Sequence, residues 1–349
     1  MIFVTGGTGL VGAHLMYDLI SRGERVRALR RKGSSTNRTE KIFSCYSTES
    51  QALLQKIEWV EGDVLDKESL VDLLTGVDHI YHAAATISFD PAQRENMIHT
   101  NCQGTANLVD LALSLKIPRF CHVSSISAIG SPPDGIEANE NHPWRNNGDH
   151  SAYAESKYLS EMEVWRACLQ GLDVVIVNPS VIIGPDNWKT GSSLLFSTVW
   201  KGLKFYTKGT TGFVDVRDVT AAMQRLMDDD MWEKTKNQRY ILNAENVSFR
   251  DFFYQVSDSL HVRRPGFLAG GVLLNLTCRV SEFISFVTRT PPFLTRETAR
   301  SSVRSSYYDG SKIIRAIGFE YTPVSVSIRD ISRIFLKDIS SKMVSGATF

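Results

Sequence analysis

Long hydrophobic runs are scarce in this sequence of 349 residues. The most apolar stretch, residues 266–287, is interrupted by Arg279 and Glu282, so it offers no run of about 18 uncharged apolar residues, which a membrane-spanning helix needs. The opening Met1-Ile2-Phe3-Val4 lacks the basic and apolar regions of a signal peptide. We therefore expect no transmembrane segment and a cytoplasmic location. Peripheral membrane contact by residues 266–287 is kept as the alternative to packing in the core.

A surplus of either charge is missing as well. The 39 Lys and Arg residues nearly balance 38 Asp and Glu residues, which gives a net charge of +1 and no global field to attract nucleic acid. Cysteines are few, and no two of them form a C-x-x-C pair. This argues against a disulfide framework or a zinc site. No histidine cluster has the spacing of metal ligands, so we expect no metal. The five cysteines are Cys45, Cys102, Cys121, Cys168 and Cys278.

The first third of the chain alternates short β-branched runs with helical periods, which is typical of a parallel sheet covered by helices. Between the first two runs, Val11, Leu15 and Leu19 recur at helical spacing, and Gly23 ends the pattern. This indicates an α/β fold with a doubly wound parallel sheet. The predicted strands are residues 2–4, 25–29, 57–60, 79–82, 119–123 and 174–177.

The alternation breaks after Pro179, where the sequence becomes irregular and rich in glycine and aromatic residues. Core-like segments return at residues 214–226 and 239–242. We therefore expect two domains, each built from separated stretches. Residues 1–184 with 213–245 form the parallel-sheet domain, and residues 185–212 with 246–349 form a smaller, mostly helical domain that binds substrate.

A glycine-rich turn, Thr5-Gly6-Gly7-Thr8-Gly9-Leu10-Val11-Gly12, follows the first predicted strand and opens a predicted helix. Bare positions at 6, 9 and 12 allow a tight turn and let backbone N–H groups approach a pyrophosphate at the positive end of the helix dipole. The setting predicts a dinucleotide site, with an ordinary glycine-rich loop as the alternative. The expected cofactor contacts in this turn are Gly6, Gly9, Leu10, Val11 and Gly12.

Basic residues stand at the end of the second predicted strand, where a site for NAD usually carries an acid that binds the ribose 2′-hydroxyl. The guanidinium groups of Arg30 and Arg31 suit a 2′-phosphate instead, because each can donate two charge-assisted hydrogen bonds. NADP(H) is therefore the favoured cofactor, with NAD(H) kept as the alternative. The remaining cofactor contacts are expected after the third strand, at Asp63 and Val64, and after the fourth, at Ala83, Ala84 and Ala85.

Tyr153 and Lys157 lie four residues apart, which places them on one helix face. A phenol with a pKa near 10 is a poor acid–base catalyst at neutral pH, and a neighbouring ammonium lowers that pKa by stabilising the phenolate. The pair is common by chance on helix surfaces. Combined with the glycine-rich turn upstream, it indicates a catalytic function.

Together these features resemble the extended short-chain dehydrogenase/reductases, the NAD(P)-dependent epimerase/dehydratase superfamily. The resemblance implies a Rossmann domain, a smaller C-terminal substrate domain and a catalytic triad of Ser125, Tyr153 and Lys157. It also implies that Pro179 and Ser180 line the nicotinamide pocket, and it favours a homodimer. Beside the turn and the Tyr153–Lys157 pair, it rests on Asp63, Ala83-Ala84-Ala85, Asn101-Cys102-Gln103-Gly104-Thr105, Val123-Ser124-Ser125, Asn178-Pro179-Ser180 and residues 213–219.

Three reactions share the family scaffold. Dehydratases usually carry an Asp-Glu pair after the active serine, where this chain has Ile126 and Ser127, so dehydration is not expected. Arg30 weakens the interpretation as a nucleotide-sugar epimerase without excluding it. The sequence is most similar to the dihydroflavonol-reductase and sterol-dehydrogenase branch, which implies an oxidoreductase that reduces a ketone or aldehyde, or oxidises the alcohol, of a small apolar substrate. A non-catalytic NADP-binding protein is the second alternative.

Overall fold

The computed structural model describes residues 1–344 except 89, 131, 133–134, 146–149, 271–298 and 300–301. Most of the stretch at 266–287, for which membrane contact is the alternative to core packing, therefore lies outside the described residues. Within the described part of the chain, no helix is both long and apolar enough to cross a membrane.

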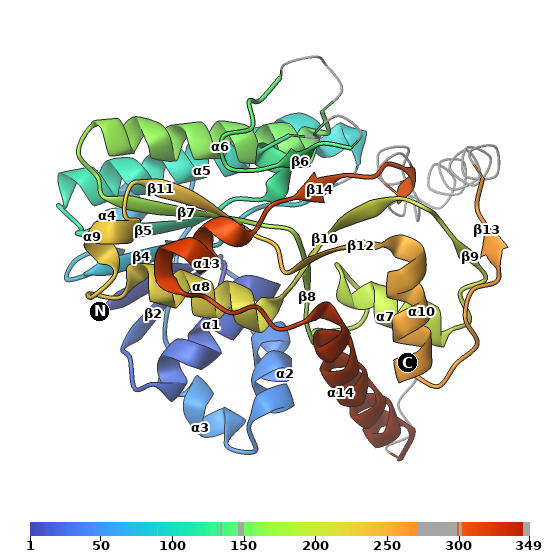
Figure 1. Ribbon diagram of the computed structural model, residues 1–349. Coiled ribbons are helices and arrows are strands. Elements are labelled where there is room, and N and C mark those ends of the chain that lie inside the picture. Colours follow the sequence, from blue (N-terminus) through green and yellow to red (C-terminus); the bar gives the residue numbers. More distant parts are fainter. Residues whose placement is uncertain are drawn as a thin grey trace.

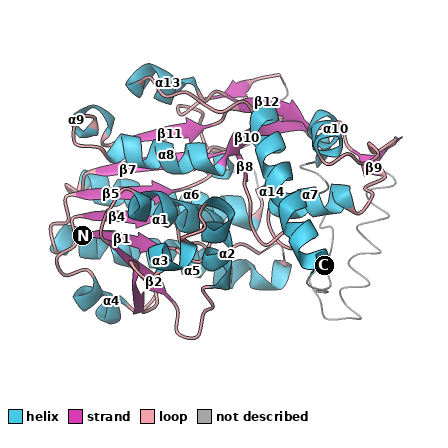
Figure 2. Cartoon of the chain, turned by 90° about the horizontal axis from the view of Figure 1, so that it is seen from below, coloured by secondary structure: helices cyan, strands magenta, loops and turns pink. Residues whose placement is uncertain are grey.

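A seven-stranded sheet forms the centre of the molecule, and all six of its strand pairings are parallel. Its order is β11-β7-β5-β4-β1-β2-β3 (Figure 2). This doubly wound arrangement confirms the predicted fold class, and the six predicted strands begin within one residue of their observed positions. The strands are β1 (Ile2–Thr5), β2 (Val26–Arg30), β3 (Glu58–Glu61), β4 (His79–His82), β5 (Arg119–Val123), β7 (Val174–Pro179) and β11 (Gln238–Leu242).

Successive side chains of each strand point to opposite faces of the sheet, so two separate cores form. On β1, Val4 packs in one core and Phe3 in the other. The two faces are covered by different helices, as Figure 1 shows. One face carries α1 (Leu10–Ser21) and α8 (Val216–Met227), and the other carries α4 (Lys67–Leu73), α5 (Arg94–Ser114) and α6 (Ala152–Leu169).

Two short helices, α2 (Asn37–Tyr46) and α3 (Ser50–Leu54), lie between β2 and β3. Helix α2 packs beside α1, and the Thr39 hydroxyl donates to the Gly7 carbonyl oxygen at 3.0 Å. Helix α2, in the connection after β2, therefore contacts the glycine-rich turn directly.

The smaller region contains sheets as well as helices, so the expectation of a mostly helical domain is incomplete. Its main sheet has the order β12-β10-β8, and residues 213–215, expected in the large domain, pair there and not in the seven-stranded sheet. The domain boundaries themselves remain a prediction. The strands are β8 (Val181–Ile183), β10 (Thr210–Asp215) and β12 (Glu245–Ser248), with the pairs β9 (Phe205–Tyr206) with β13 (Phe267–Leu268) and β6 (Glu137–Ala138) with β14 (Tyr307–Tyr308).

A third core fills this smaller region and contains the fully buried rings of Trp188, Phe196 and Phe335. Trp188 and Phe196 are 1% and 0% exposed, so these two aromatic side chains pack in the core of the smaller region. The helices are α7 (Ser193–Trp200), α9 (Trp232–Thr235), α10 (Phe249–Ser259), α13 (Ser311–Ile317) and α14 (Val324–Val344).

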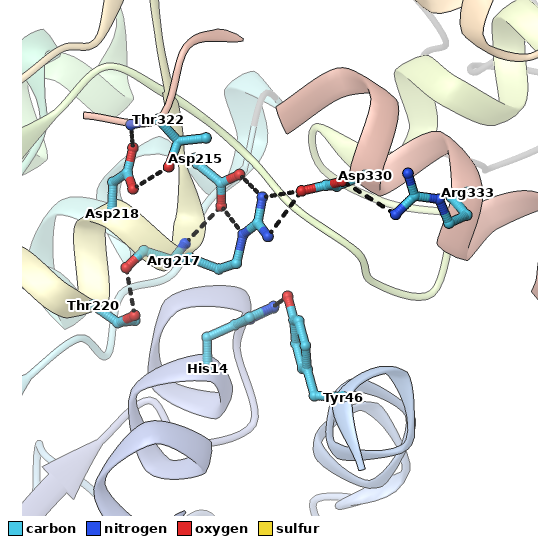
Figure 3. Close-up of polar contacts among 9 residues, drawn as sticks. All are labelled: His14, Tyr46, Asp215, Arg217, Asp218, Thr220, Thr322, Asp330 and Arg333. Atoms are coloured by element: carbon cyan, nitrogen blue, oxygen red, sulfur yellow. Dashed lines mark hydrogen bonds and ion pairs between the residues drawn. The ribbon is translucent and has the colours of Figure 1, made fainter. Parts of the chain in front are cut away.

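Ion pairs join the C-terminal segment to the start of α8 (Figure 3). The Arg217 guanidinium pairs with Asp215 at 2.7 Å and with Asp330 on α14 at 3.2 Å. Asp218 accepts hydrogen bonds from the backbone and the hydroxyl of Thr322. These contacts fix the C-terminal segment to the start of α8, which packs beside α1.

Candidate active site

The glycine-rich turn closes against the end of β4. A Cβ atom on Gly6 would lie 2.6 Å from backbone atoms of Ala83 and Ala84, and Gly6 has a φ of +73°. A Cβ atom on Gly12 would lie 2.2 Å from the Gly6 carbonyl oxygen, which accepts a hydrogen bond from the Gly9 N–H at 2.8 Å. Leu10 and Val11 begin α1 directly after Gly9. The turn is thus built for close backbone approach at the positive end of a helix.

The basic residues after β2 differ in their surroundings. Arg30 is partly buried and pairs with Glu61 at the end of β3 at 3.2 Å, while its Nε atom has no hydrogen-bond partner among the described residues. Arg31 is exposed. Ion pairs that are half open to water are weak, so a phosphate could compete with Glu61 for Arg30.

The expected contacts after β3 and β4 lie along the same carboxyl edge of the sheet. One Asp63 oxygen accepts from the Leu65 N–H at 3.0 Å. Val64 packs closely on Gly104: a Cβ atom added to Gly104 would lie 2.6 Å from the Val64 side chain. Ala85 is exposed, and the Ala84 N–H donates to the Thr5 hydroxyl at 3.2 Å.

Ser125 and Tyr153 meet at the end of β5. Ser151 caps the amino end of α6 by accepting from the Ala154 N–H at 3.0 Å, and this fixes Tyr153 in the first turn of the helix. Burial raises the pKa of Tyr153, and the Ser125 hydroxyl opposes the rise as a hydrogen-bond partner of the phenol. The Ser125 oxygen accepts from the Ser127 N–H at 3.1 Å, which leaves its proton free to be donated.

The neighbouring serines have other partners. Ser124 donates to Glu161 at 2.7 Å, and Ser127 lies in the short 3₁₀ helix Ile126–Ala128 that Ser125 caps. Geometry therefore selects Ser125 as the serine beside Tyr153.

Lys157 is the third member of this cluster. It is 5% exposed, and its Nζ donates to the Val123 carbonyl oxygen at 2.9 Å, which uses one of its three protons. Burial lowers its pKa to about 8, against the charge of Glu161, which raises it. The lowering of the Tyr153 pKa by Lys157 remains a prediction for the cofactor-bound enzyme.

Several buried polar atoms at this edge have no hydrogen-bond partner among the described residues. Besides Arg30 Nε, they include Ser180 Oγ and Asn178 Oδ1, on either side of Pro179. Buried polar groups are normally satisfied, so unpartnered ones call for a ligand or water. The bare glycine-rich turn and these orphan atoms fit a dinucleotide: the turn at the start of α1 would hold its phosphates, and Ser180 would be available to its nicotinamide end.

Asn101, expected to be structural, holds the loop after Ala85. Its amide accepts from the Thr86 N–H at 2.7 Å, donates to the Thr86 carbonyl oxygen at 2.9 Å and donates to the Ser156 hydroxyl at 3.1 Å. The loop presents Ile87 with 60% of its surface exposed. An apolar side chain is therefore exposed on the loop that follows β4 at the carboxyl edge of the sheet.

A surface hollow of about 480 Å³ lies elsewhere, between residues such as Pro118, Arg119 and Gly171. These residues stand at the amino ends of β5 and β7, whereas parallel α/β sheets bind their ligands at the carboxyl ends. The hollow is therefore separate from the candidate active site.

Comparison with known proteins agrees with this geometry. A model of the NAD dependent epimerase/dehydratase family matches residues 2–239. The chain belongs to this family. It is accordingly an NAD(P)-dependent enzyme of the extended short-chain dehydrogenase/reductase type, as the sequence predicts.

Two curated relatives are similar over most of their length. A Synechocystis protein provisionally named dihydroflavonol 4-reductase is 31% identical over 94% of this chain and 92% of its own. Sterol demethylase protein B of Methylococcus capsulatus is 32% identical over 75% of both chains. Among solved structures, that of gox2253 covers 97% of this chain and 98% of its own, with a TM-score of 0.78 and 28% identity.

Sequence reasoning missed three residues beneath the triad: Asn178 as a hydrogen-bond donor, Glu161 and Arg239. Asn178 donates to the Ser125 carbonyl oxygen and to Glu161, and Arg239 pairs with Glu161 at 2.9 Å. Glu161 continues the helix face of Tyr153 and Lys157 at the same spacing of four, which is the one local signal that could have found it.

Proposed function

We propose that this enzyme uses NADP(H) to reduce a ketone or aldehyde of a small apolar compound, or to oxidise the corresponding alcohol. The observation that carries the proposal is the cluster of Ser125, Tyr153 and Lys157 at the carboxyl edge of the sheet, beside the glycine-rich turn. Arg30 and Arg31 support NADP(H), because no acid occupies the end of β2. Homodimer formation is part of the proposal and rests on the family resemblance.

The roles of the chain's own residues follow from their contacts. A bound nicotinamide supplies the hydride. Tyr153, kept neutral by a raised pKa, holds a proton for the carbonyl oxygen, and the Ser125 hydroxyl, which contacts the phenol in the structure, would donate to the same oxygen when substrate is bound. Lys157 has two protons left for the hydroxyl groups of the nicotinamide ribose.

The substrate class is inferred from the loop that follows β4 and from the relatives. Ile87 offers an apolar surface there, and the relatives bear the names of a dihydroflavonol reductase and a sterol demethylase protein. Both names refer to compounds with fused or linked rings. We therefore propose ring-containing carbonyl compounds ahead of nucleotide sugars.

The test combines a substrate screen with Tyr153→Phe. We expect NADPH consumption with at least one apolar ketone or aldehyde, a loss of kcat of about 10²- to 10⁴-fold in the variant, and an unchanged Kd for NADPH. Nearly wild-type turnover in the variant contradicts the proposed role of Tyr153. Conversion of nucleotide sugars without net NADPH consumption would favour the epimerase, and cofactor binding without any turnover would favour the non-catalytic binder.

A further inference from the structure

Glu161 is a buried acid on α6 with four hydrogen-bond donors around it. Its side chain is 0% exposed. One carboxylate oxygen accepts from the Ser124 hydroxyl at 2.7 Å and from the Asn178 amide at 2.8 Å. The other accepts from Arg239 at 2.9 Å and from the Trp165 indole at 3.3 Å. A buried group surrounded only by donors suits an ionised carboxylate.

Two of these bonds reach the proposed catalytic serine. Asn178 uses one amide nitrogen to bind both Glu161 and the Ser125 carbonyl oxygen, the latter at 3.0 Å. Ser124 is the residue directly before Ser125 in the chain. Glu161 thus fixes the end of β5 through Ser124, which directly follows the strand, and through Asn178 of β7.

Arg239, on the edge strand β11, extends the network away from the triad. Besides pairing with Glu161, its Nε atom donates to the Glu140 carbonyl oxygen at 2.8 Å. The Glu140 carboxylate accepts in turn from the Ile241 N–H at 2.9 Å. Glu140, two residues after β6, is therefore bound to the same strand through both its backbone and its side chain.

Lys157 lies one helical turn before Glu161 and is the nearest catalytic cation. The other titratable groups that face Lys157 are Tyr153 on its own helix, His82 on β4 and His122 on β5. Burial lowers the pKa of both histidines far below 6.5, so neither carries a charge between pH 6 and 9. Glu161 is then the charged group that opposes the effect of burial on Lys157.

We propose that Glu161, held in place by Arg239, is a positioning residue that fixes Ser125 and supplies the counter-charge for the Lys157 ammonium. The catalytic part of this proposal rests on the proposed function. Its electrostatic part concerns the cofactor-free protein and stands independently.

The main variant is Glu161→Gln, which keeps the size of the side chain and removes its charge. Because the single change leaves Arg239 buried without its partner, the double variant Glu161→Gln/Arg239→Gln secures a folded protein in which both charges are gone. Glu163→Gln is the matched control, since Glu163 lies on the same helix and pairs only with the surface residue Arg166 among the described residues. Arg239→Lys tests rescue by a conservative change.

The first measurement is an NMR titration of ¹³C-lysine-labelled, cofactor-free protein, with Lys157 assigned by comparison with Lys157→Met. Lys157 should titrate near pH 8 in the wild type and in Glu163→Gln, and about one pH unit lower in Glu161→Gln. In the double variant, which also loses the Arg239 charge, the Lys157 pKa should lie between these two values. Arg239→Lys should lie close to the wild type. An unchanged Lys157 titration in folded Glu161→Gln would overturn the electrostatic part, whether or not the protein reduces any carbonyl compound.

The second measurement is the pH dependence of NADPH binding and turnover. We expect the double variant to lose kcat by about tenfold or more at pH 7.5, with a smaller change in KM. In Glu161→Gln, the alkaline decline in NADPH binding should begin about one pH unit lower. A double variant with wild-type kcat and pH profile would reduce Glu161 to a structural residue. Failure of the wild type itself to consume NADPH would instead count against the proposed function.

Discussion

Replacing Gly12 with alanine is the sharpest test of the glycine-rich turn. The added Cβ would lie 2.2 Å from the Gly6 carbonyl oxygen and 2.6 Å from its carbon. Both are backbone atoms, so no side-chain rotation relieves the contact. The Gly6 peptide must move by about 0.8 Å before the separation reaches 3.0 Å, below which Cβ contacts are essentially never found.

The expected magnitudes follow from that displacement. Overpacking of this kind costs about 1–3 kcal/mol, and the gain of about 0.5–1 kcal/mol from alanine in a helix offsets only part of it. Moving the turn would also break at least one hydrogen bond from a backbone N–H to a bound phosphate. A donor–acceptor distance of about 2.9 Å that grows by about 0.8 Å is too long for a hydrogen bond. Such a charge-assisted bond contributes about 1.5–3 kcal/mol, which corresponds to about 10- to 100-fold in Kd.

Calorimetric titration with NADPH and thermal unfolding measure the two effects. Gly266→Ala is the matched control, because a Cβ there meets no atom within 4 Å. We expect Gly12→Ala to bind NADPH about 10- to 100-fold more weakly and to unfold a few degrees lower, while the control is unchanged. Wild-type affinity and Tm in Gly12→Ala would refute the argument that the bare turn is needed.

Two further predictions concern charge. Exchanging Arg30 for Asp and Arg31 for Ala should lower the preference for NADPH over NADH by about 100-fold or more, because contacts with the 2′-phosphate are lost. The preference is measured as the ratio of the Kd values for NADH and NADPH. The same ratio in variant and wild type would contradict a role of Arg30 and Arg31 in binding the 2′-phosphate. His14 is buried beside Tyr46, and burial lowers its pKa to about 4 (Figure 3). In the unfolded protein the His14 imidazole takes up a proton below about pH 6.5, whereas in the folded protein it stays neutral down to about pH 4. Lowering the pH through this window should therefore reduce the free energy of unfolding by up to about 3 kcal/mol. In urea unfolding at pH 7 and pH 4.5, His14→Gln should lose less stability on acidification than the wild type, and identical losses would exclude His14 as a source of acid sensitivity.

Much of the fold can be predicted because its signals are local. The β-branched runs locate six strands of the large sheet, and the glycine-rich turn marks the start of α1 where the structure has it. The spacing of Tyr153 and Lys157 places both on α6, one turn apart. These features depend on residues close in sequence, which is why a single chain reveals them.

The rest depends on contacts between distant residues. Arg239 pairs with Glu161 from 78 residues away, and no local pattern joins them. The apolar pair Phe213-Val214 predicts a buried strand but does not indicate which sheet that strand enters. In the structure it pairs with β8 and β12. Trp188 suits a substrate wall by composition, whereas packing against Phe335 places it in the core.

The transfer of hydride to a carbonyl carbon is the central claim, and isotope transfer tests it most directly. NADPH carrying deuterium at C4, prepared separately in its two stereochemical forms, is supplied with a carbonyl compound that the enzyme reduces, and the product is analysed by mass spectrometry. We predict one deuterium on the alcohol carbon from one form and none from the other. Product without deuterium from either form would contradict the account.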